Sequence, residues 1–226
     1  MSTRVKAALG LVSARRLSSG SVERGSFASL FPEPLRRHLV RVDVRADGHC
    51  GAHVLSILNF ALRRKVASPT QIRSSIYMLL CGRVRDALPA GLRREFTQTF
   101  ERVCMGAYLN DADIALFLHS QNLHAHILTH GEGDRILVQS FRAQGAVGHV
   151  FLIFSHGCHW EVLARSSAKG GFCPIWTIRG GDALLAHLRA TRASTFQDGA
   201  NPRATYTTVL DGVPLFRIDA EDRLWV

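Results

Sequence analysis

The sequence predicts an α+β fold, and three observations carry that prediction. In the first half of the 226-residue chain, apolar residues recur with the period of a helix, most clearly from Cys50 to Arg64. In the second half, short apolar or alternating segments are separated by turn sequences, as strands are. Hydrophobic residues make up 46% and charged residues 20%, a globular composition that excludes wholesale disorder. Helices followed by mostly antiparallel strands are typical of a helical part packed on one sheet.

Local patterns justify the elements in chain order. Residues 39–44 alternate apolar and charged side chains, which indicates a half-exposed strand. Proline stands where two helices would begin, at Pro69 and Pro89, and Asn110 or Asp111 can cap another. Residues 155–158 form a turn sequence between two strand-like segments. We expect strands at 39–44, 124–128, 150–154, 159–163 and 175–178, helices at 50–64, 69–80, 89–103, 110–118 and 183–192, and a hairpin around Asp211-Gly212.

Positive charge gathers at the start of the chain. Residues 1–40 carry seven basic and two acidic residues, which is half of the net charge of +10. We therefore expect residues 1–37 to be a basic flexible arm, residues 38–165 to be the catalytic core, and residues 166–226 to be an extension packed on that core. A basic arm of this kind can contact nucleic acid, carry a targeting signal or remain a solvated tail.

Cysteine usage and hydropathy indicate in which cellular compartment the protein is expected. The five cysteines are odd in number, none has Cys-x-x-Cys spacing, and no secretory signal is evident. This is typical of reduced thiols in an intracellular, cytoplasmic protein. No stretch approaches the roughly 20 apolar residues of a membrane helix, so no membrane partner is expected.

Cys50 is placed for thiol chemistry. It follows a strand and an Asp-Gly turn and opens a helix, where the helix dipole and free backbone N–H groups would lower the pKa of its thiol. The same turn, at Asp47 and Gly48, can present backbone N–H groups to an oxyanion. A buried structural cysteine is the alternative, and Cys158 is a rival nucleophile.

A histidine base has to lie close to that thiol. His159 begins the return strand of a hairpin, and Glu161, two residues later, projects from the same face. Glu161 is therefore expected to orient the imidazole. His53, three residues after Cys50, is a rival base.

Two sequence blocks resemble the ovarian-tumour (OTU) family of cysteine peptidases. Residues 44–51, Val-Arg-Ala-Asp-Gly-His-Cys-Gly, are similar to its first block, Asp-Gly-x-Cys after a strand. Residues 159–162, His-Trp-Glu-Val, are similar to its second block, and residues 108–128 to the block between them. The separation of 109 residues between Cys50 and His159 fits as well. Glu161 departs from the usual Asn or Asp, and Gly51 from a large apolar residue.

The resemblance implies an OTU-like, papain-like fold and a thiol protease. Such a hydrolase would be a deubiquitinase that cleaves ubiquitin, or a ubiquitin-like modifier, after its C-terminal Gly-Gly, with Cys50, His159 and Glu161 as catalytic residues. It implies no cofactor and no metal. The Gly-x-Cys-Gly-x-His run is more similar to virus-encoded OTU proteases, which would act on a viral polyprotein in the host cytoplasm. An inactive OTU-like module that binds RNA is the other alternative.

Two further patterns involve histidines and a Gly-Gly pair. His124, His126 and His130 alternate along a strand in a way that suggests zinc, but a fourth ligand is missing from the pattern. Arg179-Gly180-Gly181 is similar to the end of ubiquitin and is a candidate self-cleavage site, although an ordinary turn before a helix is favoured.

Overall fold

The computed structural model describes residues 3–17, 27–84, 108–130, 135–155, 157–167, 171–191 and 194–198, and the dipeptides 209–210, 213–214, 217–218 and 224–225. The helix expected at residues 89–103 lies outside these residues.

Most of the long helices precede most of the strands along the described chain. The helices are α1 (Thr3–Ala8), the 3-10 helix η1 (Phe27–Leu30), α2 (Glu33–Arg36), α3 (Cys50–Arg63), α4 (Pro69–Val84), α6 (Asp111–Ser120) and α7 (Ile178–Ala190). The strands are β1 (Leu11–Arg16), β2 (Leu39–Val44), β3 (Leu123–His130), β4 (Ile136–Phe141), β5 (Gly148–Ser155), β6 (His159–Ser166), β7 (Phe172–Cys173), β8 (Ile175–Trp176), β9 (Ser194–Asp198), β10 (Val209–Leu210), β11 (Val213–Pro214), β12 (Arg217–Ile218) and β13 (Leu224–Trp225).

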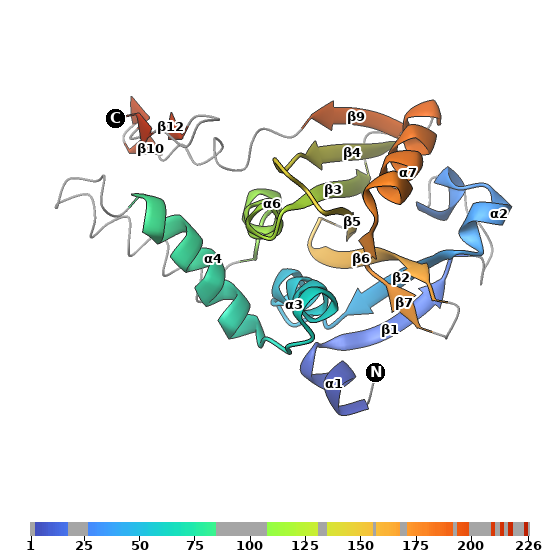
Figure 1. Ribbon diagram of the computed structural model, residues 1–226, viewed down its shortest axis with the longest axis horizontal. Helices are drawn as coiled ribbons and strands as arrows, with labels where there is room; N and C mark the ends of the chain where they lie inside the picture. Colours follow the sequence, from blue (N-terminus) through green and yellow to red (C-terminus); the bar gives the residue numbers. More distant parts are fainter. Residues whose placement is uncertain are drawn as a thin grey trace.

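One mixed sheet organises the fold (Figure 1). Its main path runs β1-β2-β6-β5-β3-β4-β9, with β7 added to β6 and β8 to β5. The β3–β5 and β4–β9 pairs are parallel, and every other pair in this sheet is antiparallel. The predicted α+β class with a mostly antiparallel sheet is therefore confirmed.

The sheet is covered on both faces, because its central strands are apolar on both sides. On one face, α3, α4 and α6 pack against residues such as Val42 and Val162. On the other face, α7 and η1 pack against residues such as Phe151 and Leu163. Figure 1 shows α3 and α7 on opposite sides of the strands. Two short charged segments of β2 and β6 interrupt the second apolar face, and they belong to the candidate site.

The N-terminal segment differs from the expected flexible arm in its described parts. Strand β1 pairs antiparallel with β2, and Leu9 is fully buried in the core. Gly10, at φ +68°, makes the bend between α1 and β1, and a Cβ there would meet the ring of His53 at 2.2 Å. The sequence did not predict this strand, because its basic residues Arg15 and Arg16 lie exposed at a sheet edge.

Helix α7 starts five residues before the predicted helix, since Thr177 caps it by accepting the backbone N–H of Gly180. Gly180 and Gly181 therefore lie in its first turn, and a Cβ on Gly181 would meet His149 at 2.3 Å. A protease binds the residues before the scissile bond in an extended form, so the folded chain does not present Gly180-Gly181 as a cleavage site. Among the described helices, none is long and apolar enough to cross a membrane.

Candidate active site

A tight turn joins β2 to α3 and sets the position of Cys50. Gly48 adopts φ +81°, a left-handed conformation that glycine enters at no steric cost. The Asp47 carboxylate accepts the backbone N–H of His49 at 3.0 Å, and Arg73 of α4 donates to the carbonyl of Gly48 at 3.3 Å. One hydrogen bond within the turn and one from α4 therefore stabilise this turn. Helix α3 begins at Cys50, as predicted.

The Cys50 thiol is buried beside the start of strand β6. The residue is 1% exposed, and its Sγ lies 3.6 Å from the carbonyl oxygen of Cys158, the residue before His159. Burial raises the pKa of the thiol above its ordinary value, although the backbone N–H groups of Trp160, Gly51 and Cys50 lower it. The expected lowered pKa is therefore wrong, because desolvation outweighs the N–H donors of the helix start. A thiol of this kind needs a base to become a nucleophile.

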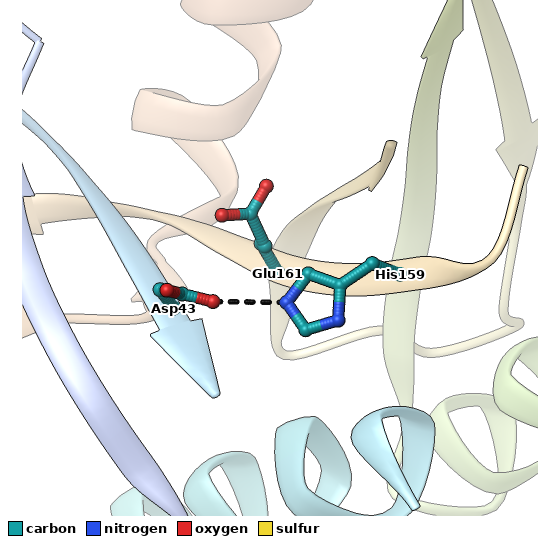
Figure 2. A group of neighbouring side chains, drawn as sticks. All are labelled: Asp43, His159 and Glu161. Atoms are coloured by element: carbon teal, nitrogen blue, oxygen red, sulfur yellow. Dashed lines mark hydrogen bonds and ion pairs between the residues drawn. The ribbon is translucent and has the colours of Figure 1, made fainter. Parts of the chain in front are cut away.

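His159 offers that base. Its Nε2 lies 2.9 Å from Oδ1 of Asp43 on the neighbouring strand β2, as Figure 2 shows. A carboxylate only accepts hydrogen bonds, so Nε2 carries the proton of the neutral ring and Nδ1 holds a lone pair. Nδ1 is buried and has no hydrogen-bond partner among the described residues. The imidazole thus has one edge fixed by Asp43 and the other free to take a proton.

Glu161 does not make the contact that was expected of it. Both of its carboxylate oxygens lie 2.8 Å from Nε of Arg41, and Ser155 donates to one of them at 3.4 Å. In Figure 2 the carboxylate points away from the ring of His159. Glu161 does share a strand face with His159, as the period of two predicted, but Arg41 binds its charge. The carboxylate that contacts the imidazole belongs to Asp43.

The rival base His53 is engaged elsewhere. Its Nε2 lies 3.0 Å from Oδ2 of Asp47, and its ring packs under Gly10. Burial raises the pKa of Asp47, but the hydrogen bonds from His53 and from the backbone of His49 hold it below its ordinary value. The Asp47 side chain therefore braces the turn. The backbone N–H groups of Asp47 and Gly48 stay a prediction for the oxyanion site.

Among the described cysteines, Cys158 is the rival nucleophile, because it is exposed in the β5–β6 turn next to His159. Its carbonyl oxygen contacts Cys50. It opens no helix, so no helix N-terminus serves its sulfur.

One group within the described residues has the spacing of metal ligands, namely Asp43, His159 and Glu161, with ligand atoms within 4.8 Å of one another. Arg41 already neutralises Glu161, which disfavours a cation there. The three alternating histidines do not gather as a zinc site. His126 is buried between Ser140 and His149, and burial lowers its pKa well below the ordinary value.

No protein-family model matches the chain, and no curated protein matches it. Solved structures do. The chain is similar to an OTU deubiquitinase from Wolbachia pipientis wMel, with 12% identity over 62% of this chain and 95% of that one, at a TM-score of 0.45. An OTU domain solved in complex with ubiquitin is 12% identical over 67% of this chain and 84% of that one, at a TM-score of 0.46. The OTU protease of Taggert virus is 11% identical over 60% of this chain and 92% of that one, at a TM-score of 0.39. Similarity to OTU domains is thus found at low identity.

Asp43 is the site residue that sequence reasoning missed. It lies in a strand whose alternation made its side chain look like ordinary solvated charge. The signal that could have found it is its position, since it is an acidic residue near the end of the strand that leads to the turn of the nucleophile, and this strand is the neighbour of β6.

Proposed function

We propose that the chain is a cysteine peptidase in which Cys50 is the nucleophile, His159 is the general base and acid, and Asp43 orients His159. The observation that carries this proposal is the hydrogen bond from His159 Nε2 to Asp43, which leaves the buried Nδ1 without a partner. Cys50 opens a helix and contacts the residue before His159. Nucleophile, base and orienting carboxylate are the three parts that thiol hydrolysis requires.

The reaction follows from these parts. His159 Nδ1 takes the proton of the Cys50 thiol, and the thiolate attacks the carbonyl carbon of the scissile amide. The tetrahedral intermediate then collapses as the imidazolium gives its proton to the leaving amine, and the C–N bond breaks. A thioester on Cys50 remains. Water, deprotonated by His159, attacks this thioester and releases a carboxylate and the free thiol.

Backbone N–H groups would stabilise the intermediate. Those of Cys50 and Gly51 lie at the start of α3 and already interact with the sulfur. With the turn at Asp47 and Gly48 beside them, they form the donor set for a developing oxyanion. Such preorganised donors typically contribute about 3 kcal/mol each to catalysis.

The substrate class comes from the resemblance of the two sequence blocks to OTU peptidases. We propose ubiquitin or a ubiquitin-like modifier, cleaved after its C-terminal Gly-Gly. A site that accepts only glycine at the two positions before the scissile bond excludes most other chain ends.

Hydrolysis of ubiquitin and of ubiquitin-like modifiers that carry a C-terminal fluorogenic amide tests this proposal. The wild-type protein should release the fluorophore from at least one modifier. Cys50→Ala and His159→Ala should release no fluorophore. Both variants should have the same unfolding temperature as the wild type. Turnover that survives Cys50→Ala would show that another residue is the nucleophile.

A further inference from the structure

An ion pair between the buried carboxylate of Glu161 and the partly exposed Arg41 lies next to the imidazole of His159 and is not used by the proposed reaction. The Glu161 side chain is 4% exposed, and Nε of Arg41 approaches both of its oxygens at 2.8 Å, while Nη2 reaches one of them at 2.5 Å. Ser155 supplies one more donor. The negative charge of Glu161 is therefore fully engaged, mainly by a single arginine.

The strand geometry places this pair against the Asp43–His159 pair. Arg41 and Asp43 alternate on β2, and His159 and Glu161 alternate on β6, so all four project from one face of two adjacent strands. Polar atoms of Asp43, His159 and Glu161 lie within 4.8 Å of one another. Two carboxylates are thus close to the one imidazole N–H, and only Asp43 accepts it.

Resting on the function proposed above, we propose that Arg41 is a positioning residue: it holds Glu161, so that Asp43 alone accepts the imidazole N–H of His159. A carboxylate buried without a cation seeks the nearest donor, because burial without a partner is costly. Without Arg41, Ser155 still donates to one oxygen of Glu161, and a ring nitrogen of His159 lies within 4.8 Å of the carboxylate. The ring would then be shared between two carboxylates on different strands, and Nδ1 would lose its fixed direction.

A second arginine, Arg15, provides a matched control for the replacement of Arg41. A polar cavity of about 260 Å³ adjoins the group and is lined by Ser13, Arg15, Arg41, Asp43 and Glu161. Arg15 stands opposite Arg41 in the β1–β2 register. It is the second cation of the cavity, but no hydrogen bond or ion pair between it and Glu161 is among those of the described residues. Replacing Arg15 removes the same charge from the same cavity without releasing Glu161.

The test compares Arg41→Met, Arg41→Met/Glu161→Gln and Arg15→Met. For Arg41→Met, we expect kcat to fall about tenfold with KM nearly constant, because the loss equals roughly one charge-assisted hydrogen bond. The double variant should regain kcat to within about threefold of the wild type. Arg15→Met should match the wild type.

Removing the cation that pairs with a buried carboxylate destabilises a fold, so Arg41→Lys serves as a second variant. It keeps the charge but loses the contact with both oxygens, so its kcat should lie between those of Arg41→Met and the wild type. Unchanged kcat in Arg41→Met would overturn the proposal. So would a double variant as impaired as the single one, because a merely structural role of Arg41 is not rescued by removing the charge of Glu161.

A second readout keeps this test separate from the substrate proposal. The rate at which iodoacetamide alkylates Cys50 depends on the base beside it and needs no ubiquitin. Arg41→Met should slow this alkylation, and the double variant should restore it. If no modifier is cleaved and this pattern still appears, the substrate class is wrong and the role of Arg41 stands. If alkylation is equally fast in the wild type, in Arg41→Met and in the double variant, Arg41 does not position His159.

Discussion

Replacing Asp43 by alanine removes the carboxylate that accepts the imidazole N–H of His159 at 2.9 Å. Both groups are partly buried, with side-chain exposures of 36% for Asp43 and 17% for His159. A hydrogen bond that involves a charged group contributes about 1.5–3 kcal/mol, so kcat should fall by about 10- to 150-fold. KM should change little, because Asp43 acts on the base rather than on the substrate.

Two further variants sharpen this experiment, which measures hydrolysis of a fluorogenic ubiquitin amide. Asp43→Asn keeps an oxygen that can accept the N–H, and its loss should be smaller than that of Asp43→Ala. Asp182→Asn is the matched control, since Asp182 also faces a histidine, His149, at 3.5 Å, but lies on α7. It should retain wild-type kcat. The assignment of Asp43 is refuted if Asp43→Ala keeps kcat within about twofold, or if Asp182→Asn loses as much.

Three other outcomes are expected. Gly181→Ala should lower the free energy of unfolding in urea by about 1–3 kcal/mol, because the added Cβ would meet His149 at 2.3 Å; an unchanged midpoint would contradict that packing. Burial lowers the pKa of His126, so below pH 6.5 the unfolded chain binds a proton at this residue that the native state does not bind. The free energy of unfolding should therefore fall as the pH drops below 6.5. Thermal unfolding of the wild type and of His126→Gln should differ in that pH range. Burial raises the pKa of Cys50 above 9.0, so in His159→Ala its alkylation by iodoacetamide should require more alkaline pH than free cysteine does.

Local patterns predicted the elements that build the site. Residues 39–44, 50–63 and 159–163 show clear periods of two or 3.6, and the structure has β2, α3 and β6 there. The capping signal at Asn110 is also confirmed, since its side chain accepts the N–H of Asp113 in a capping box. By contrast, β1 and β4 were missed, because a basic segment and a segment after a glycine-rich loop gave weaker apolar signals.

The partner of His159 could not be read from local spacing. Asp43 is 116 residues away in the chain and meets His159 only because β2 and β6 are neighbours in the sheet. The period of two placed Glu161 on the correct face, but it could not show that Arg41 from the next strand would bind it. The pKa of Cys50 was misjudged for a related reason, because the depth of burial depends on residues distant in the sequence, such as Trp160 and Leu109.

The most direct test is covalent labelling with ubiquitin whose C-terminal carboxyl is replaced by a thiol-reactive electrophile. After incubation and proteolytic digestion, mass spectrometry should find the adduct on Cys50 alone in the wild type and in Cys158→Ser. Cys50→Ala should show no adduct and should unfold at the same temperature as the wild type. An adduct on Cys158, or an unlabelled wild-type protein in which iodoacetamide also leaves Cys50 unmodified, would contradict Cys50 as the nucleophile of this site.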